Sequence, residues 1–188
     1  MKLATSLLAA AGLAGIASSL PLEARDTCSY IYQPTLYWIS QHQSDDPATP
    51  QPSININQQI GFVDTIASFS GIPGGATGCT LEYNFVPNPN AQVYGTGNPQ
   101  VINVFALPET LPSPITWNTL APVTGSLVGT WQFPTGAALN SPQKIFINSF
   151  VCTPTMNFRF EVADTWSVYG GISDVDTASS GMTIAYNC

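Results

Sequence analysis

The stretch GMTIAYNC, residues 181–188, alternates apolar and polar side chains up to a cysteine at the end of the chain. With a period of two, Met182, Ile184, Tyr186 and Cys188 share one face of a strand, which is typical of a half-buried β-strand. We therefore expect Cys188 to point inward and to form a disulfide that fixes the chain end.

The rest of the chain also has the sequence pattern of β-strands. Sixteen Pro and fifteen Gly interrupt it every few residues, and no helical apolar stripe occurs after residue 25. Runs rich in β-branched and aromatic residues lie between these turn residues and predict strands at 35–40, 63–72, 79–85, 100–107, 126–133, 144–152, 155–163 and 181–188. The segments 71–78, 86–99, 106–114 and 153–155 are expected to be loops. The segment 43–53 resembles a linker, and 170–181 is expected to be an ordinary turn. About eight strands predict an all-β fold, an antiparallel, jelly-roll-like β-sandwich.

The N-terminus has the pattern of a secretory signal peptide, residues 1–19. Lys2 precedes an Ala/Leu-rich stretch that ends in small residues, too short for the roughly 20 apolar residues of a spanning helix. A short pro-piece at residues 20–25 would end at the basic Arg25. We expect residues 26–188 to form a single β-sandwich domain that is secreted and is extracellular or associated with the cell wall.

All four cysteines lie after residue 25. An even number in a secreted chain predicts two disulfides, with three connectivities open. Spacing does not choose among them. Because the terminal strands of a sandwich are often neighbours, we favour Cys28 with Cys188 and Cys79 with Cys152.

Positive charge is scarce. Lys144 and Arg159 are the only Lys or Arg side chains after residue 25, against ten of the eleven acids, so the net charge of this part is 2 minus 10, or −8. Phosphate-tracking and anionic-membrane surfaces need clustered Lys and Arg. We therefore expect no nucleic acid and no membrane as partner, and a polar, weakly charged surface that suits a neutral, hydroxyl-rich ligand.

Patterns for nucleophilic or metal chemistry are weak. The single histidine, His42, lies in a polar run without a nucleophile elbow. Asp45 and Asp46 beside it do not complete a metal-ligand set. Asp174 and Asp176 suit an ordinary turn better than a calcium loop. We expect no catalytic residue, no metal and no cofactor.

Paired carboxylates for glycoside hydrolysis are a further alternative. Glu82 and Glu161 alternate with inward aromatic residues, so both are expected on outward strand faces. If their strands are neighbours, one of them can pair with Arg159 in a surface contact of small value, about 1 kcal/mol at most.

Four tryptophans remain. We expect Trp131 in the core with Leu127 and Phe133, and Trp38 in the core with Leu36. The ligand-binding candidates are the loop residues Trp117, Asn118, Trp166 and Tyr169. Flat rings stack on sugar faces and amides bond hydroxyl groups, although a buried loop anchor has the same sequence pattern.

Five segments in order resemble a fungal secreted family that carries the ubiquitin-binding protein But-two C-terminal domain. They are SFSGIPGGATGCTLEYNF at 68–85, INVFAL at 102–107, ITWNTLAP at 115–122, INSFVCTPTMNFRFEV at 147–162 and the terminal GMTIAYNC. That family has no assigned catalytic residues, so the resemblance implies no active site. Its name, from association with a ubiquitin-like modifier, suggests a protein partner.

The segment from residue 69 to residue 122 is also similar to DNRLRE-type jelly-roll modules of bacterial surface and polysaccharide-degrading proteins. Some of those modules bind polysaccharide. The chain is thus expected to be a secreted, non-catalytic, monomeric β-sandwich that recognises cell-wall polysaccharide. The alternatives are an effector-like or ubiquitin-like protein partner and, third, a glycoside hydrolase or lyase.

Overall fold

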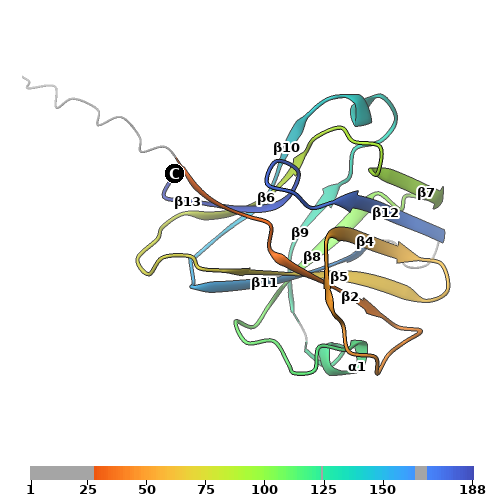
Figure 1. Ribbon diagram of the computed structural model, residues 1–188, viewed down its shortest axis with the longest axis horizontal. Helices are drawn as coiled ribbons and strands as arrows, with labels where there is room; N and C mark the ends of the chain where they lie inside the picture. Colours follow the sequence, from red (N-terminus) through yellow and green to blue (C-terminus); the bar gives the residue numbers. More distant parts are fainter. Residues whose placement is uncertain (1–27, 124, 164–168) are drawn as a thin grey trace, which may run out of the picture.

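The structure is a computed structural model that describes residues 28–123, 125–163 and 169–188. Within these ranges the chain forms an antiparallel β-sandwich of two sheets (Figure 1), as the sequence predicted. The smaller sheet has the strand order β1 (Ser29–Tyr32), β13 (Gly181–Tyr186), β6 (Cys79–Phe85) and β10 (Gln143–Phe150). The first and last strands are therefore neighbours.

The larger sheet has nine strands among the described residues. Its main path runs β7 (Gln92–Thr96), β12 (Tyr169–Val175), β4 (Ser53–Gln58), β5 (Phe62–Ser70), β11 (Thr155–Val162), β8 (Val101–Leu107) and β9 (Ser126–Gln132). Off this path, β2 (Thr35–Ser40) pairs with β5 and with β3 (Pro50–Gln51).

Helical structure in the described part is limited to two short segments, α1 (Trp117–Leu120) and the 3-10 turn η1 (Gly136–Asn140). Thr116 caps α1, and its side chain accepts a hydrogen bond from the backbone N–H of Thr119. Neither segment has the length or the hydropathy that a membrane-crossing helix requires.

The core lies between the two sheets and follows from strand alternation. Leu81, Tyr83 and Phe85 of β6 are at most 1% exposed, and they face a layer that includes Phe158 and Phe160 of β11. Trp131 is 4% exposed in the same cluster, as expected. Burial of apolar surface contributes roughly 25 cal/mol per Å² to the free energy of folding. This continuous cluster is therefore the main source of stability.

A second, smaller apolar cluster covers the outer face of the larger sheet. Ile39 of β2 and Ile66 of β5 pack there against Leu120 of α1. The β8–β9 connection that carries α1 therefore folds back onto the sheet and does not extend into solvent. Figure 1 shows α1 at the bottom of the view, below β2.

Both favoured disulfides are present, Cys28–Cys188 and Cys79–Cys152. The inward position expected for Cys188 is wrong, because β13 ends at Tyr186 and Asn187 takes a left-handed φ of 57°, which breaks the alternation and leaves Cys188 exposed. The other face of β13 is also buried, with Thr183 2% exposed. The pattern of a half-buried strand therefore underestimated its burial.

The eight expected strands are all present, with ends displaced by at most two residues. Among the described residues, β1, β3, β4, β7 and β12 were not predicted. The linker-like segment 43–53 contains β3, the expected loop 86–99 contains β7, and the expected turn 170–181 contains all of β12 except Tyr169. These strands are short or rich in Gly, Asn and Pro, so their composition resembles that of turns.

Two core predictions are wrong. Leu127 is 56% exposed because a register shift after Val104 makes Phe105 pair with Leu127, and Val128 packs inward instead. Trp38 is half-buried and lies outside both core clusters; its indole N–H donates to the Ser53 carbonyl at 2.8 Å.

Candidate functional site

The outer face of the smaller sheet carries an open groove of about 620 Å³. We name it the tyrosine groove and define it by Tyr30, Tyr32, Asn84, Gln143, Lys144 and Ser179. Its volume falls within the roughly 300–1,000 Å³ that is typical of small-molecule sites.

The position of the two tyrosines follows from the alternation of β1. Ile31 packs against the core, so Tyr30 and Tyr32 project from the opposite face. In the β1–β13 register Tyr30 pairs with Ala185 and Tyr32 with Thr183, whose small side chains leave room for the rings. The two rings stack with centroids 5.5 Å apart and an interplanar angle of 21°. Tyr32 is 42% exposed.

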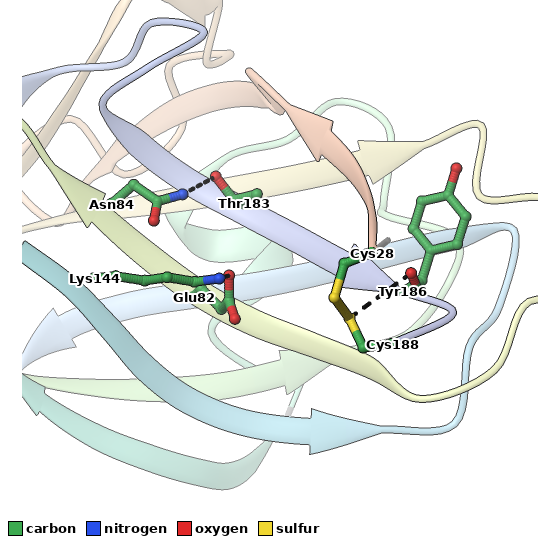
Figure 2. Close-up of polar contacts among 7 residues, drawn as sticks. All are labelled: Cys28, Glu82, Asn84, Lys144, Thr183, Tyr186 and Cys188. Atoms are coloured by element: carbon green, nitrogen blue, oxygen red, sulfur yellow. Dashed lines mark hydrogen bonds and ion pairs between the residues drawn. A yellow bond between two sulfur atoms is a disulfide. The ribbon is translucent and has the colours of Figure 1, made fainter. Parts of the chain in front are cut away.

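Polar residues of β6 and β10 line the groove together with the aromatic pair. Figure 2 shows Glu82 and Asn84 of β6, Lys144 of β10 and Thr183 of β13. Lys144 Nζ lies 2.8 Å from Glu82 Oε2 and 5.2 Å from the centroid of the Tyr30 ring. The amide of Asn84 donates to Thr183 Oγ1 at 3.0 Å. Glu82 lies on the outward face of β6, as expected, but it pairs with Lys144 and not with Arg159.

The tyrosines were not among the candidates from the sequence. The signal that could have found them is the run SYIY at residues 29–32, in which aromatic residues alternate with a β-branched one. The strand has only four residues and follows directly after Cys28, so it was not recognised as a strand.

The predicted platform at Trp117 is partly buried. The indole stacks on Phe62 with centroids 6.2 Å apart, and the Arg159 guanidinium lies 5.1 Å from its ring centroid. Asn118 is exposed, but its amide donates to Asp45 Oδ1 at 2.8 Å and to Ser44 Oγ at 3.2 Å. Both residues thus hold α1 to its surroundings, which fits the loop-anchor interpretation.

Of the other predicted pair, only Tyr169 belongs to the described residues. Trp166 lies outside the described residues. Tyr169 begins β12 and is 58% exposed, and it pairs with Thr96 of β7. It is therefore an exposed tyrosine on the other sheet from the tyrosine groove.

Beneath Trp117, Arg159 binds two carboxylates. Its Nε and Nη2 lie 2.7 Å and 2.6 Å from Asp64 Oδ2, and Nη2 lies 3.3 Å from Glu161 Oε2. Burial raises the pKa of Asp64 to about 7, although the nearby guanidinium opposes the shift. Burial also raises the pKa of Glu161.

These two acids do not make the open pair that a glycosidase needs. Asp64 is 1% exposed, so its carboxylate is out of reach of a substrate. Both acids also share the same cation, Arg159. The cluster is a buried ion-pair network that joins β5 to β11.

Asp174 is not in a turn, contrary to expectation. It lies in β12, is fully buried, and accepts hydrogen bonds from the Tyr83 hydroxyl and from the Asn88 amide at 2.8 Å. Asp176 follows the strand, and burial raises its pKa to about 7. No group of three metal-ligating side chains that could hold an ion occurs in residues 28–123, 125–163 and 169–188.

Neither a scan against protein-family models nor a search of curated proteins returned a match for this chain.

Proposed function

We propose that the protein is a secreted, non-catalytic module that binds a neutral cell-wall polysaccharide in the tyrosine groove. The observation that carries this proposal is the stacked pair Tyr30 and Tyr32, which projects from the outer sheet face into a groove of about 620 Å³. Tyrosine rings present an apolar body and a polar hydroxyl. They can therefore pack against the C–H face of a sugar and also bond its hydroxyl groups.

The polar groups of the groove suit the same ligand. Asn84, Gln143 and Ser179 line it and have uncharged hydrogen-bonding side chains. A few placed polar groups beside an apolar surface are what orient a ligand in such sites. The chain also has very few Lys and Arg side chains, which argues against an acidic polymer.

A secreted protein fits the two disulfides, and we propose that it acts as a monomer. Two disulfides are compatible with an extracellular location, since such bonds persist in oxidising compartments. The resemblance to a family without assigned catalytic residues favours recognition over chemistry. Asp64 is buried, so the pair that it forms with Glu161 around Arg159 is not open to a substrate.

A pull-down with insoluble polysaccharides, together with a glycan array, tests this proposal on the secreted protein. We expect Tyr32→Ala to weaken binding about two- to twelvefold, since an aromatic stacking contact contributes roughly 0.5–1.5 kcal/mol. Tyr169→Ala is the matched control, because it removes an exposed tyrosine outside the groove. Failure of the unchanged protein to retain any polysaccharide, or an equal loss in both variants, would contradict the proposal.

A protein partner is the second candidate, and one observation favours it. Phe146 of β10 is 59% exposed and pairs in register with Glu82, next to the tyrosine groove. Exposed apolar groups beside a groove can mark a protein interface. If Phe146→Ser abolishes retention of an extracellular protein while no polysaccharide binds, the protein-binding function replaces the first proposal.

A further inference from the structure

Glu82 and Lys144 form an ion pair at the side of the tyrosine groove. The two residues come from neighbouring strands, β6 and β10, and lie diagonally across the sheet, because Lys144 pairs in register with Asn84 and Glu82 with Phe146. The Nζ to Oε2 distance is 2.8 Å (Figure 2). The side chain of Glu82 is only 10% exposed, whereas that of Lys144 is 52% exposed.

Lys144 is the more exposed partner of the pair, and the buried carboxylate of Glu82 balances its positive charge. The hydrogen bond from Lys144 to Glu82 raises the pKa of Lys144, so the side chain stays protonated. The pairing directs its hydrogen-bonding capacity toward the carboxylate. The aliphatic stem and the ammonium remain beside the Tyr30 ring, where a ligand would contact them.

Among residues 28–123, 125–163 and 169–188, no second cation lies close enough to replace it. Arg159 is the only other Lys or Arg side chain after residue 25, and it lies on the larger sheet with two carboxylates of its own. An acidic sugar in the tyrosine groove would therefore have to compete with Glu82 for Lys144. It would also bring a carboxylate close to the Glu82 carboxylate, which like-charge repulsion disfavours.

We infer that Glu82 determines the charge selectivity of the groove: it neutralises Lys144 so that the site accepts neutral glycans and rejects uronic-acid polymers. This inference rests on the proposed function, because it names the ligand class of the same groove. Lys144 then contributes apolar stem contacts and single hydrogen bonds to hydroxyl groups, and it does not act as an anion anchor.

Substitution of Glu82 by glutamine tests the inference, because Glu82→Gln keeps the size of the side chain and releases the Lys144 charge. Affinity electrophoresis through a neutral β-glucan and through polygalacturonate provides the two readouts. We expect Glu82→Gln to gain at least roughly tenfold in affinity for polygalacturonate, the value of a charge-assisted hydrogen bond. High salt should reduce that gain.

The double variant Glu82→Gln with Lys144→Gln is the matched control. It has the same net charge as the unchanged protein, so it should not gain affinity for polygalacturonate. Thermal unfolding of each variant, compared with the unchanged protein, separates altered selectivity from loss of fold.

The outcomes distinguish this inference from the proposed function. If the unchanged protein prefers polygalacturonate to neutral glucan, the charge inference fails while polysaccharide binding stands. The inference also fails if folded Glu82→Gln gains nothing. If the unchanged protein binds no neutral polysaccharide but Glu82→Gln acquires polygalacturonate binding, the exclusion of acidic polymers by Glu82 stands, whereas the acceptance of neutral glycans and the proposed function fail.

Discussion

The stability of the fold should fall as the pH rises, because several carboxyl groups are buried in it. Burial raises the pKa of Asp64 from 3.8 to about 7, and burial together with the nearby Asp174 raises that of Asp176 to about 7. The pKa values of Asp174 and Glu161 are raised in the same direction. A carboxyl group with a raised folded-state pKa binds its proton more tightly when folded, so its stabilisation is complete below the unfolded pKa and is lost as the pH passes the folded pKa.

The size of the effect follows from proton linkage. For Asp64, a change in pKa from 3.8 to about 7 gives a loss of about 2.5 kcal/mol in the free energy of unfolding between pH 5 and pH 8. For a domain of this size, roughly 2–4 °C of Tm corresponds to each kcal/mol. Asp64 alone therefore predicts a Tm lower by about 5–10 °C at pH 8 than at pH 5, and Asp176 adds to this fall.

Thermal and urea unfolding at constant ionic strength, followed by near-UV circular dichroism, measure this directly. Asp64→Asn should flatten the pH dependence by about 2.5 kcal/mol, whatever its effect on absolute stability. Asp46→Asn, which removes an exposed acid, is the control for the general repulsion of a chain with a net charge of −7. A Tm that is constant or rises from pH 5 to pH 8, or an Asp64→Asn slope equal to that of the unchanged protein, would refute the reasoning.

Three other predictions concern named contacts. Trp117→Ala should lower the free energy of unfolding by about 1–3 kcal/mol, because it uncovers the Arg159 guanidinium, and it should leave retention on polysaccharide unchanged in the pull-down. Arg159→Met leaves Asp64 buried without its partner, so urea titrations should show a loss of about 3–5 kcal/mol at pH 8 and a smaller loss at pH 5, where Asp64 is protonated. The double variant Cys28→Ser with Cys188→Ser should lose about 2–5 kcal/mol in the same titrations, and it should lose polysaccharide binding at a lower urea concentration than the unchanged protein does; normal stability and normal binding would contradict this.

The strands that the sequence predicted are those with one face toward the core and the other face away from it. Tyr83 and Phe85 alternate with polar residues because β6 has a core face and an outer face, and the period of two is visible in the chain. β12 gave no such signal. Gly170 has a φ of 136°, and a Cβ there would lie 2.0 Å from the Tyr94 carbonyl oxygen, so glycine is needed at the close approach of β12 to β7. Its sequence therefore resembles a turn although its backbone is a strand.

The site was harder to predict than the fold because exposure depends on tertiary packing. Trp117 stands between proline-rich segments, which favours an exposed ring, but the connection folds onto the larger sheet and Phe62 covers one face of the indole. Tyr32 is exposed and Tyr30 is half-buried on the outer face of the smaller sheet, where the small side chains of their partners Ala185 and Thr183 on β13 leave room for the rings. The pairing joins residues 29–32 to residues 183–186, which are far apart in the sequence, so no local sequence pattern reveals it.

The pairing of β1 with β13 also explains the disulfide between Cys28 and Cys188. Cys188 is exposed, and neither Cys28 nor Cys188 belongs to the apolar cluster between the sheets, so this disulfide does not fill the core. β1 has four residues and pairs only with β13, at the edge of its sheet. An edge strand this short, next to a chain end, would fray without a covalent tie.

The strand that the disulfide holds is the one that carries Tyr30 and Tyr32. Loss of the bond should therefore affect the tyrosine groove before it affects the core, and polysaccharide binding should be lost at a lower urea concentration than the near-UV signal of the buried aromatic residues.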